Sequence, residues 1–187
     1  MSFFELFLNY LSKSSLITIF VLSWLSIYLI LSFTILISRL VGLSSWKERE
    51  QTALESVIMG SKVENTDSVL RKCGEVSKET LEVYSSLAEA NATSGLTVLA
   101  IIASTSPFIG LFGTVVSILE TFSTLGSGGS GLNVIAPAIS EALVATGCGI
   151  FVAIPAYSFN LLLKRKAFEI LSIIGRTSNV LLGRKEK

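Results

Sequence analysis

One carboxylate and two hydroxyls are the residues of this sequence whose type and position could do chemistry. Glu141 is the single charged residue between Thr121 and Leu163. A carboxyl group among apolar residues can exchange a proton at ordinary pH, because burial destabilises its charged form. The hydroxyls of Thr114 and Thr146 could extend a polar route from it. This combination is typical of a proton pathway, and a structural acid bonded to a neighbouring helix is the alternative interpretation.

Most other chemistry is disfavoured by what the sequence lacks. It has no His, which removes the commonest metal ligand, the commonest general base and the Ser–His or Cys–His nucleophile pairs. Cys73 and Cys148 fall in different parts of the expected topology, so neither a disulfide framework nor a zinc site is expected. A net charge of +1 gives no basic field for nucleic acid. With no phosphate-binding glycine motif either, we expect no enzyme, and no metal, cofactor or nucleic acid as a ligand.

Long stretches without charge predict the elements that must position these residues. Residues 14–38 are 25 residues without a charge, residues 90–119 are another 30, and the stretch 121–163 contains Glu141 alone. About 20 apolar residues cross a bilayer as a helix, and the Gly/Ser-rich segment 126–131 has the composition of a turn. The sequence therefore predicts an all-α integral membrane protein with three transmembrane helices. A soluble helical bundle would need polar outer faces, which these stretches lack.

The basic residues predict how this chain is oriented. Fourteen of its 15 Lys and Arg residues fall on one side of a three-span chain, and Lys13 is the exception. By the positive-inside rule that side is cytoplasmic, so the N-terminus faces out and the C-terminus faces in. The expected segments are a periplasmic N-terminus (1–13), transmembrane helices at 14–38, 95–125 and 134–163, a cytoplasmic helical insert (39–94), a periplasmic turn (126–133) and a cytoplasmic basic tail (164–187).

An apolar stripe along the cytoplasmic insert predicts a helix that packs rather than a cofactor site. We expect this helix to run on into the second span and to pack on the tail after Lys164. Packing between subunits is also expected, because a short helix alone in water is marginal. The stripe consists of Leu70, Cys73, Ser77, Leu81, Tyr84 and Ala88, and Cys73 is expected to be an ordinary helix residue.

The hairpin of the second and third spans sets the level of the candidate residues. If it is symmetric about residue 129, Thr114 lies level with Val144, between Glu141 and Thr146. Glu141 lies about 140° around the helix from Thr146, so the two cannot line one narrow face. We expect the threonines to face a central lumen and Glu141 to lie near a subunit boundary. Each of these two spans has a stripe of small residues, for which tight helix packing is the alternative explanation. The stripe on the second span is Ala103, Ser106, Gly110, Thr114, Ser117 and Thr121, and the stripe on the third is Ala138, Ala142, Thr146, Gly149, Ala153, Ala156 and Asn160.

The sequence of this hairpin resembles a known family. Segment 107–116 reads PFIGLFGTVV, and segments 136–147 and 153–156 read APAISEALVATG and AIPA. Over about residues 95–165 these segments resemble the MotA/TolQ/ExbB proton-channel family. The length of the chain argues against MotA, which has four spans, and favours the TolQ or ExbB type. Ser117 and the pair Gly147–Cys148 depart from the family pattern, in small or soft side chains that affect packing more than a pathway.

The resemblance implies a motor of the bacterial inner membrane driven by the proton motive force. It implies a homo-oligomeric ring, expected to be a pentamer, around a TolR/ExbD-like single-span partner whose aspartate loads and unloads protons. Force would reach the cell envelope through a TolA- or TonB-like protein. On this sequence Thr114 and Thr146 would line the pore and Glu141 would be the membrane acid. Contacts with the pore or partner helix are expected at Ser106, Gly110, Ser117, Ala142, Gly149 and Ala153, and helix-shaping roles at Pro107, Pro137 and Pro155.

Two other functions stay open at the level of sequence. One is an oligomeric membrane scaffold that conducts nothing, and the other is a self-sufficient ion channel. Replacing Glu141 by Gln or Thr146 by Val would leave a scaffold's function intact but would impair a motor. A channel would conduct without a second polypeptide, whereas the motor requires one.

Overall fold

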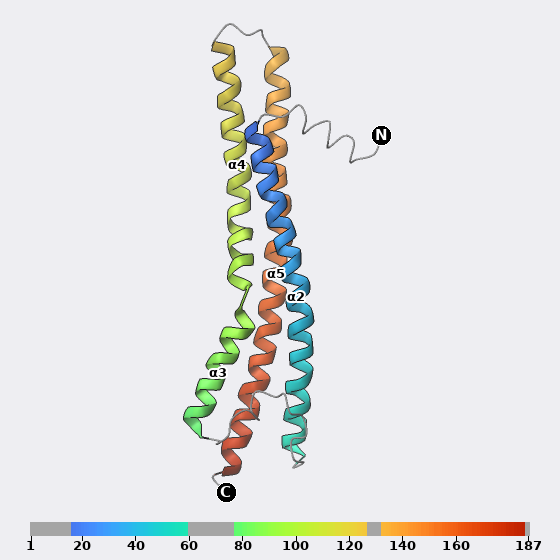
Figure 1. Cartoon of the computed structure of the whole chain (residues 1–187), viewed down its shortest axis with the longest axis vertical. Helices are drawn as coiled ribbons and strands as arrows, with labels where there is room; N and C mark the ends of the chain where they lie inside the picture. Colours follow the sequence, from blue (N-terminus) through green and yellow to red (C-terminus); the bar gives the residue numbers. More distant parts are fainter. Residues whose placement is uncertain (1–15, 60–76, 127–131, 186–187) are drawn as a thin grey trace, which may run out of the picture. The chain divides into compact units, whose positions relative to one another are not determined.

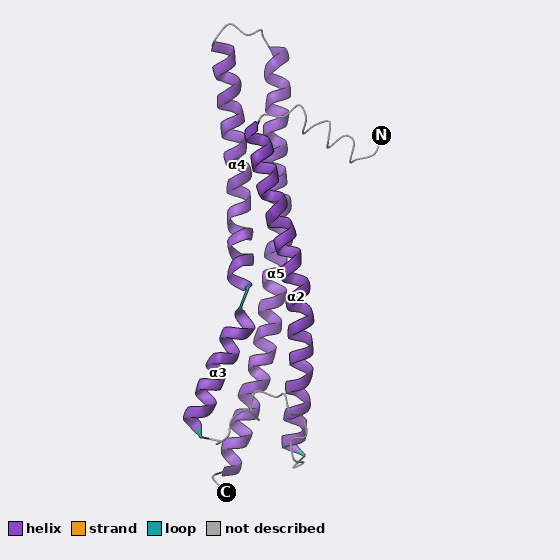
Figure 2. Cartoon of the chain, in the orientation of Figure 1, coloured by secondary structure: helices purple, strands orange, loops and turns teal. Residues whose placement is uncertain are grey.

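The computed structural model of the chain describes residues 16–59, 77–126 and 132–185. These residues form α2 (Leu16–Ile58), α3 (Lys78–Thr93), α4 (Leu96–Gly126) and α5 (Leu132–Lys185) (Figure 1). Within the described ranges Figure 2 shows helix almost throughout, with a short loop between α3 and α4. The all-helical class predicted from the sequence is confirmed.

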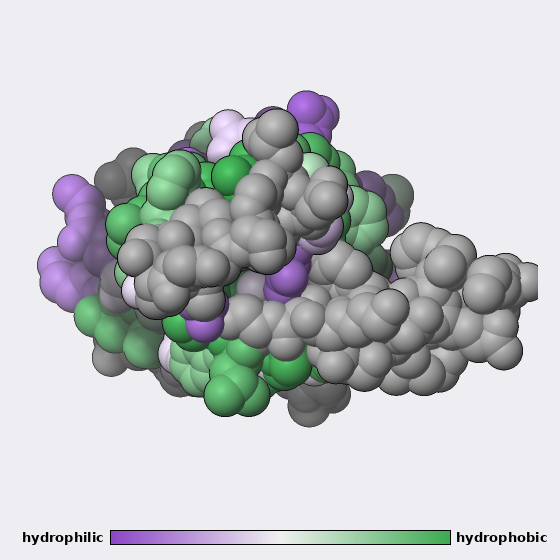
Figure 3. All heavy atoms as spheres, turned by 90° about the horizontal axis from the view of Figure 1, so that it is seen from above, coloured by the Kyte–Doolittle hydropathy of each residue, from purple (hydrophilic) through white to green (hydrophobic). Residues whose placement is uncertain are grey.

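Within the described residues three helical stretches are long and apolar enough to cross a membrane: Leu16–Ser56 in α2, Lys78–Ser123 over α3 and α4, and Ile135–Gly183 in α5. Only 28%, 28% and 33% of their most apolar windows is buried inside the chain. Phe20, Phe108 and Phe151 are 64%, 69% and 68% exposed, and hydrophobic residues are visible around the outside of the view in Figure 3. Apolar faces of this extent require lipid or protein around them.

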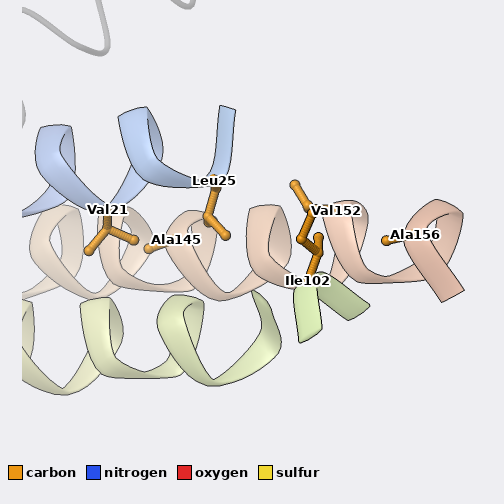
Figure 4. Packing of buried hydrophobic residues seen from close by; sticks show 6 residues of the cluster. All are labelled: Val21, Leu25, Ile102, Ala145, Val152 and Ala156. Carbon is orange, nitrogen blue, oxygen red and sulfur yellow. The ribbon is translucent and has the colours of Figure 1, made fainter. Parts of the chain in front are cut away.

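The chain divides into two compact units, the first formed by Met1–Phe33 and Val98–Ser158. Its buried core draws on α2, α4 and α5, whose side chains meet in Figure 4. The three helices approach closely at Gly113, where an added Cβ would lie 3.2 Å from Val21 Cγ1 and 3.3 Å from Ala145 Cβ. The core residues are Val21, Leu25, Ile102, Ala145, Val152 and Ala156.

The second unit, Thr34–Thr97 and Phe159–Lys187, is held together by polar contacts between α2 and α5. Lys47 Nζ donates to Glu169 Oε2 at 2.7 Å, and Lys166 Nζ donates to Ser44 Oγ at 2.7 Å. Both contacts join residues 122 positions apart, so α2 and α5 run parallel in a constant register. The hydrogen bond and charge of Lys47, with Arg165, hold the pKa of Glu169 below its ordinary value.

The junction between α3 and α4 differs from the sequence prediction of one continuous helix. Helix α3 ends at Thr93, and Gly95 adopts a φ of 82°, the left-handed conformation that glycine tolerates and that ends helices. Arg39 of α2 donates to the Asn91 carbonyl in the last turn of α3 at 3.4 Å. Asn160 of α5 donates to the Leu96 carbonyl at the start of α4 at 2.6 Å. The prediction of a continuous helix was therefore wrong, because a glycine break held from two sides separates α3 from α4.

The predicted packing of this helix on the C-terminal tail is confirmed. Leu81 of α3 is buried and packs with Tyr84 against Leu181 and Leu182 of α5. Ser77 caps α3 by accepting a hydrogen bond from the Thr80 N–H at 3.2 Å. The expectations for the N-terminus 1–13, for Leu70 and Cys73 of the stripe, and for residues 127–131 of the turn lie outside the described residues.

Candidate functional site

Helices α4 and α5 bring Thr114 and Thr146 into direct contact inside the first unit. Their hydroxyl groups are hydrogen-bonded to each other, and either can be the donor. Thr114 Oγ1 lies 3.1 Å from the Ala142 carbonyl oxygen of α5, and Thr146 Oγ1 lies 3.3 Å from the Gly110 carbonyl oxygen of α4. Thr114 thus contacts residues on both sides of Val144, which confirms the level predicted from the hairpin. Both threonines are half-buried.

This hydroxyl pair has two equivalent hydrogen-bond arrangements. Each hydroxyl has one proton to donate and can also accept. If Thr146 donates to Thr114, then Thr114 donates to the Ala142 carbonyl at 3.1 Å or to the Gly110 carbonyl at 3.2 Å. If Thr114 donates to Thr146, then Thr146 donates to the Gly110 carbonyl. Every donated proton has an acceptor in both cases, so the pair can reverse its direction without losing a hydrogen bond.

Glycines allow α4 and α5 to approach closely enough for this contact. A Cβ added at Gly110 would lie 2.7 Å from the Ala145 carbonyl oxygen and 3.0 Å from Thr146 Cα. A Cβ added at Gly149 would lie 2.6 Å from the Ser106 carbonyl oxygen. Because the opposing atoms belong to the backbone, neither position has room for a side chain. The contact across the two glycines therefore fixes the spacing at which the threonine hydroxyls meet.

The small-residue stripes are the surfaces through which α4 and α5 pack within one chain. All six residues expected to contact a pore or a partner helix are buried in the described chain. A side chain buried in this way offers almost no surface to a second polypeptide, so their placement supports the packing alternative for these positions. They are Ser106, Gly110, Ser117, Ala142, Gly149 and Ala153.

Glu141 lies on α5, five residues before Thr146, and is half-buried. That separation corresponds to a rise of about 7.5 Å and a rotation of about 140° around the helix. The carboxylate therefore lies within two turns of the hydroxyl pair along the axis, but on a different face of α5. The prediction that Glu141 and the threonines occupy separate faces agrees with this placement, and a subunit boundary beside Glu141 stays a prediction.

The three prolines lie inside the helices, Pro107 in α4 and Pro137 and Pro155 in α5. A proline has no N–H for the carbonyl four residues earlier, and its ring distorts the preceding turn. Both helices nevertheless continue through these positions. The prolines thus sit where they can shape a helix without ending it.

Sequence reasoning missed a buried carboxylate in the second unit. Glu50 of α2 has no exposed surface and accepts a hydrogen bond from Trp46 Nε1 at 3.1 Å. It lies in the charged run Lys47 to Glu50, which reads as a solvated surface. The signal that could have found it is Trp46, whose indole N–H needs a partner when the ring is partly buried.

Comparison with known proteins agrees with this arrangement of residues. The model of the MotA/TolQ/ExbB proton channel family matches residues 50–175, a range that contains the hydroxyl pair and Glu141. The chain belongs to this family. The family assignment made from the motifs of the two spans is confirmed, and together with the three apolar helices it makes the chain a multi-pass membrane protein.

Individual relatives resemble the chain over different lengths. The biopolymer transport protein ExbB-like 1 of Helicobacter pylori (strain 26695) is 38% identical over 182 residues, which cover 94% of this chain and 96% of that protein. The Tol-Pal system protein TolQ of Haemophilus influenzae is 54% identical over 59 residues, 31% of this chain and 26% of TolQ. The biopolymer transport protein ExbB of Neisseria gonorrhoeae is 54% identical over 63 residues, 33% of this chain and 29% of that protein. The family to which the chain belongs is described as one of proton channels.

Proposed function

We propose that this chain is the ring subunit of a proton-driven motor in the bacterial inner membrane. Five copies would surround a TolR/ExbD-like single-span partner, with each N-terminus in the periplasm and each C-terminus in the cytoplasm. The observation that carries the proposal is the hydroxyl pair of Thr114 and Thr146, placed by α4 and α5 among apolar spans of a proton-channel family member. Packing alone needs the glycines of this contact but not two hydroxyls that bond across it.

The hydroxyl pair would serve as a relay beside the titrating group of the partner. The partner's aspartic acid would give its proton to one hydroxyl, which passes its own proton to the second hydroxyl, and the second hydroxyl would release its proton to water in the pore; rotation of both O–H bonds then restores the starting arrangement. The two arrangements described above differ by rotation of two O–H bonds, and the backbone carbonyls of Ala142 and Gly110 accept in turn. Glu141 would be the acid of the ring itself, at the boundary between subunits.

The energy available explains why such a contact should be polar and small. One elementary charge that crosses 100 mV releases about 2.3 kcal/mol. This is less than the cost of disrupting a tightly packed core contact, so the partner helix must move along the ring without breaking large side-chain contacts. We infer that proton passage turns or shifts the partner within the ring and that a TolA- or TonB-like protein carries the force onward.

Proton flux into liposomes tests this function. Three preparations are compared at an imposed pH gradient. They are the chain alone, the chain with its TolR/ExbD-like partner, and the Glu141→Gln variant of the chain with the same partner. The matched control is Glu120→Gln, which removes the acidic residue of α4 near the expected periplasmic end of that helix. We expect flux only with the partner, a strong reduction in Glu141→Gln, and flux close to that of the unsubstituted chain in Glu120→Gln.

Each of the other functions gives a different result in the same experiment. Flux from the chain alone would favour a self-sufficient channel. Partner binding without any flux would favour a non-conducting scaffold. Either result would overturn the motor.

A further inference from the structure

Helix α3 carries exposed hydrophobic residues on the face opposite its own packing contact. Leu81, Ala88 and Ala92 face inward and are at most 4% exposed, whereas Val83 and Leu87 are 57% and 53% exposed. Val83 lies about 140–160° and Leu87 about 100–120° around the helix from Leu81 and Ala88. Since α3 lies in the charged insert outside the apolar spans, lipid is not the natural cover for them, and such surfaces mark contacts with protein.

The second unit also contains a groove of complementary character between α2 and α5. It has a volume of about 430 Å³, and its apolar lining comes from Leu54, Phe168 and Ile173. Its charged lining comes from Lys47, Glu169 and Arg176, which leaves one positive charge in excess. Phe168 is 72% exposed beside this groove.

We propose that α3 of one subunit docks into the α2–α5 groove of the adjacent subunit. The occupant is thus a second copy of this chain, and the inference rests on the ring of identically oriented subunits proposed above. Val83 and Leu87 would cover the apolar floor of the groove, and the acidic side chains of α3 would face its basic rim. The contact would join the subunits on the cytoplasmic side.

Depth along the membrane normal supports this pairing. Within one chain Leu81 packs against Leu181, and Leu96 accepts a hydrogen bond from Asn160, so α3 and α5 run in opposite directions. Interpolation between these two contacts puts Leu87 at the depth of Ile173 and Glu89 at the depth of Glu169. Because Glu169 is paired with Lys47 of α2, Glu89 is also level with Lys47. Rotation about the membrane normal keeps every residue at its depth, so the groove of a neighbour lies level with this part of α3.

Charge spacing supports the same register. Helix α3 has two negative charges in excess, from Glu79, Glu82 and Glu89 against Lys78. Glu82 lies seven residues before Glu89 on α3, and Arg176 lies seven residues after Glu169 on α5, so each separation is about 10.5 Å along its helix. By the same depth relation Glu82 falls about one turn of α5, or roughly 5 Å, from the level of Arg176, a distance that these two long side chains can bridge. Exposed charge pairs contribute little free energy, but they set register and partner choice.

Cross-linking between two differently tagged copies tests the contact directly. In a background of Cys73→Ser and Cys148→Ala, one copy carries Leu87→Cys and the other carries Ile173→Cys, so that a disulfide between these sites can form only between chains. We expect a dimer that carries both tags in membranes treated with a mild oxidant. The control pair combines Leu87→Cys with Phe151→Cys, an exposed residue of the apolar part of α5, and should give no such dimer.

Charge reversal provides a second readout that does not depend on cysteine chemistry. Glu82→Lys and Arg176→Glu should each lower the yield of the cross-linked dimer several-fold, and the two together should restore it. Glu48→Lys, an exposed acid of α2 outside the groove, should leave the yield unchanged.

Two outcomes would refute the docking of α3, and only one of them would also refute the ring. A ring of normal mass that forms no Leu87–Ile173 cross-link, or that loses the cross-link in the charge variants without rescue, would overturn the docking of α3 while leaving the motor intact. A chain that is monomeric in membranes and in mild detergent would remove both the docking and the proposed ring.

Discussion

The close approach of α4 and α5 leads to the most specific prediction, the effect of Gly110→Ala. The new Cβ would lie 2.7 Å from the Ala145 carbonyl oxygen, whereas ordinary contacts begin at 3.4 Å, so the helices must separate by about 0.7 Å. The hydrogen bonds of Thr114 to Ala142 and of Thr146 to Gly110, now 3.1 and 3.3 Å, would lengthen to about 3.8 and 4.0 Å and would be lost.

The expected free-energy change follows from these distances. Overpacking a tight contact costs about 1–3 kcal/mol, and each hydrogen bond lost between transmembrane helices costs about 0.6 kcal/mol. Gly147→Ala is the matched control, because nothing lies within 4 Å of a Cβ added there and both variants gain the same helix propensity. We expect Gly110→Ala to be about 3 kcal/mol less stable than Gly147→Ala.

Unfolding in mixed micelles of mild detergent and dodecyl sulfate, followed by circular dichroism, measures this difference. Proton flux with the partner should fall in Gly110→Ala as well, because the hydroxyl pair loses the carbonyl contacts that orient it. Equal stability of the two variants would refute the view that backbone contact at Gly110 sets the spacing of α4 and α5.

Three further predictions concern the second unit. Gly95→Ala should destabilise the chain by about 2–3 kcal/mol relative to Gly42→Ala in the same micelle assay, because Gly95 has a φ of 82° whereas Gly42 lies inside α2, where alanine gains helix propensity. Equal stability would contradict the glycine break. Leu81→Ala should lower the free energy of unfolding by about 2 kcal/mol and speed amide hydrogen exchange in α3. The exposed control Ser85→Ala should do neither. Unchanged exchange in Leu81→Ala would show that α3 does not depend on its packing against the C-terminal tail. The pKa of Glu169 is lowered by Lys47, so its stabilising contact is present above the ordinary carboxyl value of 4.5 and is lost as pH falls through the lowered pKa. Glu169→Gln should therefore lower the unfolding midpoint at pH 7, and its effect should shrink as pH falls below 4.5; an effect that does not change with pH would contradict this assignment.

Patterns of charge and small residues predict much of this fold. Stretches without charge locate the three apolar helices because the cost of placing charges in lipid is large and acts at every position. The level of Thr114 against Thr146 follows from hairpin symmetry, since both helices rise by the same distance per residue. The packing of Leu81 on the tail follows from a stripe with helical spacing.

Other features depend on how helices rotate about their axes, which the sequence pattern does not determine. The same stripes fit a lumen or a packed contact, and the structure places Ser106, Gly110 and Ala142 in the contact between α4 and α5. The break at Gly95 was overlooked because its flanks are helical on both sides, although a Ser–Gly pair at the end of a periodic segment is a known stop signal. The clamps from Arg39 and Asn160 join residues 52 and 64 positions apart, beyond the reach of local pattern.

Proton flux through the complex with Thr146→Val, compared with Thr146→Ser, shows whether the hydroxyl pair lies on the proton pathway. Valine keeps the shape of threonine but removes the hydroxyl that bonds to Thr114, whereas serine keeps the hydroxyl and removes a methyl group. In liposomes that contain the chain and its TolR/ExbD-like partner, we expect serine to retain most of the flux and valine to abolish it. Normal flux through the Thr146→Val complex would contradict a proton pathway along the hydroxyl pair.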